Sequence, residues 1–130
     1  MRREFILPEE DLDYITSLGL EWETIRTGGD WVIIHNYPVP AGYNVANVKV
    51  AIKIDAGYPV SQIDMVYFYP ALFLTSGKAI GALSPTQIDG NSWQRWSRHR
   101  TGENPWRPGL DNLSTHMQLV KFWLERELIK

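Results

Sequence analysis

Ser97 and His99 are the residues whose types and spacing come closest to nucleophilic chemistry. They lie two positions apart in the run Trp96-Ser97-Arg98-His99, and an extended chain directs alternate side chains to the same side. A hydroxyl is a weak nucleophile unless an adjacent base accepts its proton, and histidine is the usual base. The spacing therefore predicts Ser97 as a nucleophile and His99 as its base. Asp89, in the turn-forming pair Asp89-Gly90, could orient His99.

The same run has a structural alternative. Trp93 and Trp96 are three residues apart, with polar residues between them, which is also what a loop needs to fasten itself onto a helix. In that interpretation Arg98 and His99 are simply solvated. Both interpretations remain open at the level of sequence.

Other covalent and metal chemistry has little support. The chain has no cysteine, which excludes disulfides, thiolate metal sites and thiol nucleophiles. No two of His35, His99 and His116 are at helical metal-site spacing. We therefore expect no metal and no cofactor, and we interpret His35 and His116 as hydrogen-bonded structural histidines.

Length and charge indicate one domain and exclude some partners. A chain of 130 residues fits a single domain, here 1–130, with a core of its own. The net charge is −2, so nucleic acid and anionic membranes are not expected partners. Arg2 and Arg3 precede no apolar run long enough for a signal peptide or a membrane span. The expected location is the cytoplasm.

The first half of the chain has the pattern of one helix followed by strands. Pro8 to Leu18 predicts a helix that ends at Gly19 and directs Leu12, Ile15 and Leu18 inward. Trp22–Ile25 and Trp31–His35 predict a hairpin, and Val45–Ile54 alternates apolar and polar residues as a strand does. A fourth strand is predicted within Ile63–Leu74, interrupted by Pro70.

The second half predicts a loop region and a helix. Thr75–Leu110 contains five glycines and three tryptophans without sustained periodicity, so we expect a long structured loop in which function should be sought first. Apolar residues from Leu113 onward recur at steps of three and four, which predicts a long helix capped by Asp111 or Asn112. The expected fold is α+β, with an N-terminal helix, a four-stranded antiparallel meander, an irregular Trp-rich segment and a C-terminal helix.

This order resembles that of the ubiquitin-conjugating enzyme (UBC) superfamily. Gly57-Tyr58-Pro59 is similar to the superfamily's Tyr-Pro turn, and Asn104-Pro105-Trp106-Arg107-Pro108 is similar to the Trp-x-Pro element that precedes its late helix. The run Trp93 to His99, Trp-Gln-Arg-Trp-Ser-Arg-His, resembles the prokaryotic branch designated family E. The resemblance covers nearly the whole chain and implies a UBC-like fold.

The departures from that superfamily concern its chemistry. Its His-Pro-Asn triplet should fall near Tyr69 to Thr75 and is absent, and spacing from Tyr58-Pro59 puts its catalytic cysteine at Leu83 or Ser84. The chain therefore has no residue that could form a thioester. Ser84 becomes a rival nucleophile to Ser97, because Leu83-Ser84-Pro85 has the pattern of a constrained turn that presents a side chain.

The resemblance implies a role in a conjugation pathway with two protein partners, a ubiquitin-like protein and an activating-enzyme-like (ThiF-type) adenylyltransferase. In the leading hypothesis the chain carries the ubiquitin-like protein as a serine oxyester, and Arg95 or Arg98 holds its tail. The expected partner-binding set is completed by three tryptophans, Trp93, Trp96 and Trp106. The alternative is a catalytically inactive module that docks the ubiquitin-like protein or its activating enzyme.

Overall fold

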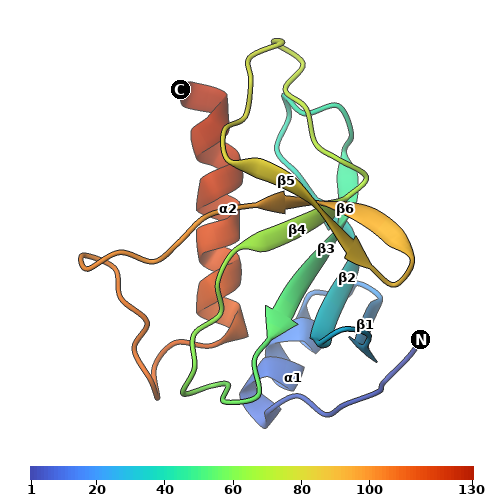
Figure 1. The fold of residues 1–130 in the computed structure, drawn as a ribbon, viewed down its shortest axis with the longest axis vertical. Coiled ribbons are helices and arrows are strands. Elements are labelled where there is room, and N and C mark those ends of the chain that lie inside the picture. Colours follow the sequence, from blue (N-terminus) through green and yellow to red (C-terminus); the bar gives the residue numbers. More distant parts are fainter.

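A computed structural model describes all 130 residues and shows an α+β fold with a helix near each end of the chain (Figure 1). The predicted first helix, hairpin, long strand and last helix are confirmed. The predicted antiparallel meander of four strands is present, but the predicted strand number is wrong, because two further strands extend the sheet to six. The elements are α1 (Glu9–Ser17), β1 (Trp22–Arg26), β2 (Asp30–Pro38), β3 (Asn47–Ile54), β4 (Val66–Tyr69), β5 (Leu83–Ile88), β6 (Asn91–Trp96) and α2 (Leu113–Ile129).

The two unpredicted strands form a hairpin inside the segment expected to be irregular. The sheet is antiparallel in the order β1-β2-β3-β4-β6-β5, so β4 pairs with β6 and β5 is an edge strand. Sequence patterns miss β5 because only Ile88 of its six residues is buried, and Pro85 is a residue that strands accept mainly at an edge. The predicted turn at Asp89-Gly90 is confirmed, since both residues have positive φ, and it joins β5 to β6.

One face of the sheet packs against α2. Leu113, Met117, Val120 and Leu124 of this helix are buried in a core with sheet residues such as Val50 and Phe68. The predicted cap is Asn112, whose side chain accepts a hydrogen bond from the Thr115 N–H in a capping box. No helix has the length and apolarity required to cross a membrane.

The buried residues of helix α1 differ in part from those predicted. Ile15 is fully buried as expected, but Leu12 is 39% exposed, and the carboxylate of Asp11 is buried in its place. The reason is tertiary, because Asp11 bonds to groups on two other segments and turns the helix toward them. The fourth strand is also shorter than expected, since it ends at Tyr69 immediately before Pro70.

The other face of the sheet is covered in part by the β5–β6 hairpin. A second core cluster joins Trp31, Ile33 and Tyr67 of the central strands to Ile88 and Trp93 of the hairpin. Arg2 fastens this closure, because its guanidinium bonds Glu23 on β1 (2.9 Å) and Asp89 at the hairpin tip (2.7 Å). These two residues belong to opposite edges of the sheet, so the sheet is curled.

The Arg2 contact predicts an acid sensitivity. Burial raises the pKa of Glu23, but hydrogen bonds from Arg2 and His35 outweigh that effect and lower the pKa to about 2, against an ordinary value of 4.5. A lowered pKa stabilises the fold above the unfolded-state value, and this stabilisation is lost as pH falls through the folded-state value. We expect Glu23→Gln to lower the free energy of unfolding at pH 7 and to have little effect near pH 2.

Urea denaturation at several pH values measures this difference. Glu103→Gln, on an exposed loop, is the matched control and should show no pH-dependent loss. An equal effect of Glu23→Gln at pH 7 and pH 2 would contradict an ionic role for this carboxylate.

Candidate functional site

The segment after β6 pairs His99 with a carboxylate that sequence reasoning did not identify. His99 Nδ1 lies 2.9 Å from Asp64 Oδ2, and no hydrogen bond joins His99 to Ser97. Asp89, which we expected to orient His99, bonds Arg2 instead, so that prediction is wrong. Asp64 lies just before β4 and His99 just after β6, and the pairing of these strands brings the two together.

A network of backbone hydrogen bonds holds this pair in place. The Met65 N–H donates to the Arg98 carbonyl (3.2 Å) and to Asp64 Oδ1 (3.1 Å). The Met65 carbonyl accepts from Nε2 of the fully buried His116 on α2 (2.8 Å). Met65 itself has φ of 60°, a conformation that costs energy for a residue with a side chain. Burial lowers the pKa of His116 to about 4, so this histidine is neutral and structural, as predicted.

Ser84, the rival nucleophile, lies within strand β5 rather than in the constrained turn expected from Leu83-Ser84-Pro85. Its hydroxyl oxygen accepts a hydrogen bond from Arg95 Nε (2.9 Å) on the paired strand. A guanidinium is a donor only and cannot accept the proton of a hydroxyl. The structure therefore provides Ser84 with a partner but with no base.

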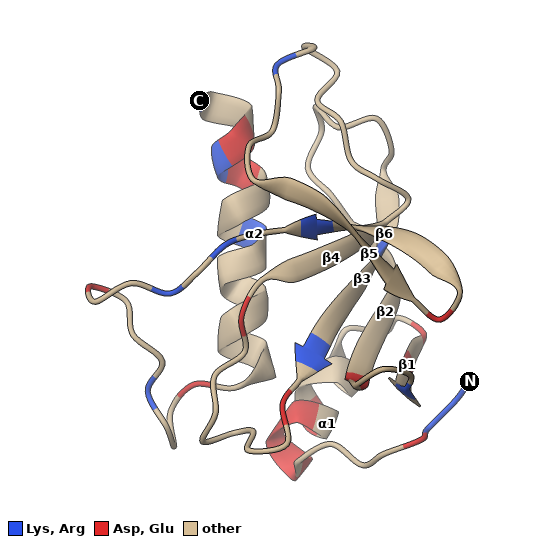
Figure 2. Cartoon of the chain, viewed as in Figure 1, with Lys and Arg blue, Asp and Glu red and all other residues tan.

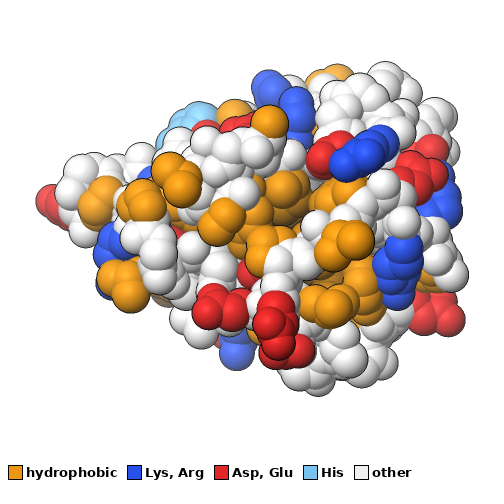
Figure 3. Space-filling view, turned by 90° about the horizontal axis from the view of Figure 1, so that it is seen from below, with side chains coloured by type: hydrophobic (Ala, Val, Ile, Leu, Met, Phe, Trp, Pro, Cys, Tyr) orange, Lys and Arg blue, Asp and Glu red, His pale blue; other side chains and the backbone are white.

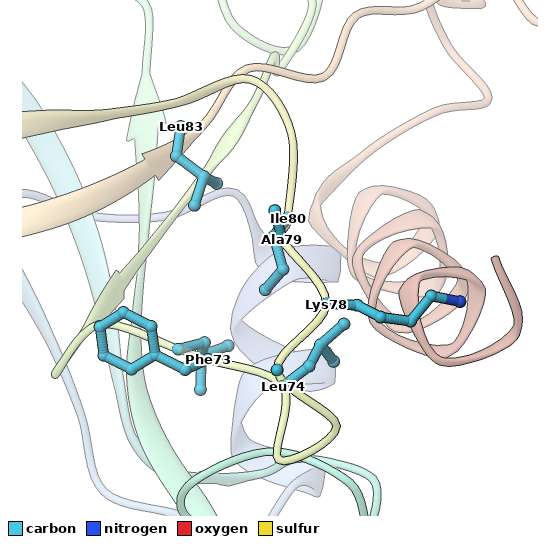
Figure 4. Close-up of a pocket in the computed structure, with 8 residues that line it drawn as sticks. Phe73, Leu74, Lys78, Ala79, Ile80 and Leu83 are labelled. Atoms are coloured by element: carbon cyan, nitrogen blue, oxygen red, sulfur yellow. The ribbon is translucent and has the colours of Figure 1, made fainter.

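An apolar hollow lies beside Leu83, on the loop that follows β4. It has a volume of about 200 Å³ and is lined mainly by apolar side chains, among them Leu72, Leu74 and Ile80. Figure 4 shows Leu83 directed toward Ile80, whereas Lys78 extends away from the hollow. No histidine or carboxylate lines it, and the amine of Lys78, its one titratable lining residue, is directed away from it.

Most residues of the predicted partner-binding set have structural contacts. Trp96 is fully buried and Trp93 nearly so, which leaves their rings no surface to offer a partner in this conformation. Arg98 donates to the Gly81 carbonyl and lies 3.6 Å from the buried Glu127 of α2. Trp106 is partly buried, and its Nε1–H donates to the Pro59 carbonyl (3.0 Å). Partner binding by Arg95 and Trp106 stays a prediction.

Tyr58 is the centre of a polar junction between three segments. Its hydroxyl donates to Asp11 Oδ2 (2.5 Å) on α1, and its oxygen accepts from the Leu113 N–H (2.8 Å) at the start of α2. The same N–H also donates to Asp11 Oδ1 (3.2 Å). Burial raises the pKa of the Asp11 carboxyl and of the Tyr58 hydroxyl. The junction fixes the Tyr58-Pro59 turn against both helices.

The surface around this turn carries exposed apolar side chains beside carboxylates. Figure 3 shows hydrophobic side chains gathered on this end of the molecule, and Figure 2 shows acidic residues on α1 next to it. Two hollows of about 420 Å³ each adjoin here and share Pro8 and Tyr58. We call this surface the Tyr58 face; it consists of Ile6, Pro8, Tyr58, Pro59, Val60 and Leu110, with Glu9, Glu10 and Asp55 at its rim.

Comparison with protein families gives a match over nearly the whole chain. The family model described as Prokaryotic E2 family E matches residues 7–127. The chain belongs to prokaryotic E2 family E. Curated proteins and solved structures give no match. The family assignment confirms the resemblance to E2-type proteins and supports an E2-like role in a conjugation pathway, while the chain has no thiol for that role.

Sequence reasoning missed Asp64 and Asp11 in this E2 family E protein. Asp64 lies far from His99 in the sequence, and no local spacing signals their contact. Asp11 has the pattern of an ordinary acidic residue in the first turn of a helix, so its burial was not apparent. No group of three or more histidine, aspartate or glutamate side chains is arranged to hold a metal ion.

The Tyr58 junction predicts a stability effect. Tyr58→Phe removes the donor to Asp11 and one of the two acceptors of the Leu113 N–H, leaving a buried carboxylate with fewer partners. We expect the free energy of unfolding in urea to fall by about 1–3 kcal/mol. Tyr69→Phe is the matched control, since it removes a hydroxyl that is not part of the junction. Equal effects of the two substitutions would contradict the role assigned to Tyr58.

Proposed function

We propose that this chain is an E2-like docking component of a prokaryotic ubiquitin-like conjugation pathway that binds its partners without carrying an acyl group itself. One observation carries the proposal: neither candidate serine has a base within hydrogen-bonding distance, and no thiol is present. An unactivated hydroxyl is a poor acyl acceptor. The partners in this proposal are the ubiquitin-like protein and its activating-enzyme-like adenylyltransferase.

The Tyr58 face is the surface that supports docking. Apolar patches rimmed by polar residues are typical of protein interaction sites. Val60, next to Pro59 in this face, is 71% exposed on a turn that the Tyr58 junction holds rigid. A preformed surface loses little conformational entropy on binding. The rim carboxylates of Glu9, Glu10 and Asp55 favour a partner whose own apolar side chains are flanked by lysine or arginine.

A second candidate function is the serine-ester carrier. The observation that favours it is the Asp64–His99 pair. His99 lies only two residues from Ser97, and the Asp64 carboxylate orients its ring. Catalytic hydrogen bonds are often incomplete in unbound enzymes and tighten when substrate binds. In this candidate a movement of Ser97 toward His99 completes the site, and Arg95 contacts the tail of the ubiquitin-like protein.

An adduct assay separates the two candidates. The protein is mixed with the activating enzyme and the ubiquitin-like protein of its own pathway and ATP, and intact mass is recorded. We expect binding without an adduct, because no activated nucleophile is available. An adduct that hydroxylamine cleaves, and that is lost in Ser97→Ala or Ser84→Ala, would instead support the oxyester carrier and identify its serine.

The docking surface predicts a selective loss of binding. Val60→Asp places a charge on an exposed apolar residue of the Tyr58 face, so we expect affinity for the partner to fall by at least tenfold in calorimetry. Phe122→Asp, on the exposed side of α2, is the matched control and should bind as the wild type does. Undiminished binding by Val60→Asp would place the docking surface elsewhere.

A further inference from the structure

Of the three histidines, His99 alone combines an oriented ring with an accessible nitrogen. His35 Nε2 is engaged by Glu23 at 2.7 Å in a mostly buried side chain, and His116 is fully buried. The His99 side chain is 60% exposed, and only its Nδ1 atom has a partner, Asp64. The docking role leaves this pair without a use.

The contact with Asp64 determines which nitrogen of His99 can accept a proton. An ionised carboxylate only accepts hydrogen bonds, so Nδ1 must carry the hydrogen that it donates to Asp64. In the neutral ring Nε2 is then the acceptor, and it has no partner in the protein. This is the orientation that a histidine requires to act as a general base.

The surroundings of the pair are more ordered than an exposed ion pair requires. Asp64 Oδ1 accepts from the Met65 N–H, which restrains the carboxylate whose other oxygen bonds His99. Met65 adopts a positive φ to make this contact, and buried His116 holds its carbonyl. Non-glycine residues in such conformations are concentrated at functional sites, where the surrounding structure holds them in place.

We propose that Asp64 and His99 form a proton-transfer pair in which His99 Nε2 accepts a proton from a primary amine that attacks an activated acyl group on the docked partner. The inference rests on the proposed docking function, because both reactants come from outside this chain. His99 is the catalytic base, and Asp64 is a positioning residue. The pair gives the chain a chemical role that needs no nucleophile of its own.

The reaction is an acyl transfer from a thioester to an amine. The amine nitrogen attacks the carbonyl carbon of the partner's carboxy-terminal thioester, a C–N bond forms, and the C–S bond breaks. The proton lost by the nitrogen passes to His99 Nε2, and the resulting imidazolium is stabilised by the Asp64 carboxylate. His99 then gives that proton to the departing thiolate, so the products are an amide and a thiol and the pair returns to its initial state.

The tautomer of His99 tests the geometry in the free protein. Two-bond nitrogen–proton couplings in NMR spectra of ¹⁵N-labelled protein distinguish hydrogen on Nδ1 from hydrogen on Nε2. We expect the Nδ1–H form in the wild type and a shift toward the Nε2–H form in Asp64→Asn. A predominantly Nε2–H ring in the wild type would overturn the proposal, since Nε2 could not then accept a proton.

A transfer assay tests the chemistry. The probe is the ubiquitin-like protein of the same pathway, prepared as a carboxy-terminal thioester of a small thiol, with free lysine as the amine. We expect saturating wild-type protein to accelerate amide formation and His99→Gln to reduce that acceleration by on the order of 100-fold. Asp64→Asn should lower kcat with little change in KM, and His35→Gln, the matched histidine control, should retain the wild-type rate.

Calorimetry with the same probe separates failure of this inference from failure of docking. If the wild type does not bind the probe, the proposed function and the inference both fail. If the wild type and His99→Gln bind equally but transfer at the same rate, docking stands and the proton-transfer pair is overturned. A serine-linked intermediate formed as fast as product would also overturn it, because the acyl group would then pass through this chain.

Discussion

The antiparallel pairing of β4 with β6 is the constraint on which the rest of this structure depends. Val66 lies opposite Trp96 in that pairing, and the two residues are far apart in the sequence. The pairing adds the β5–β6 hairpin to the sheet as an edge, and it aligns the residues that precede β4 with those that follow β6. Without it Asp64 and His99 would not meet, and Trp96 would not reach the core between the sheet and α2.

Side-chain amides complete this arrangement where the ladder stops. Pro70 ends β4, and the Gln94 side chain then bonds both backbone groups of Leu72, accepting from its N–H (2.9 Å) and donating to its carbonyl (3.1 Å). The Asn44 side chain likewise accepts from the Phe73 N–H and donates to the Ala71 carbonyl. Buried or enclosed backbone groups must find partners. These two amides provide partners for backbone groups of residues 71–73, where an irregular segment follows the strand.

The two candidate functional surfaces are built in different ways. The Tyr58 face is built from three segments that a partly buried tyrosine and a buried aspartate hold together, and it is suited to binding. The Asp64–His99 pair is built at the end of two paired strands, and it is suited to moving a proton. Neither surface contains a nucleophile. In the proposed function, this E2 family E chain without cysteine docks and orients reactants, and the reacting groups come from its partners.

Local patterns determined much of this protein. The amphipathic spacing after Leu113, the alternation in Val45–Ile54 and the Asp89-Gly90 turn each reflect a period or a backbone preference that neighbouring residues share, and each predicted its element correctly. The absence of cysteine by itself excluded a cysteine thioester on this chain. Only the tertiary structure decided the number of strands, because β5 is a mostly exposed edge whose partner strand stabilises it. Only the tertiary structure also decided that Asp64, not Asp89, orients His99, since long-range strand pairing, which no local period encodes, sets the contact between them.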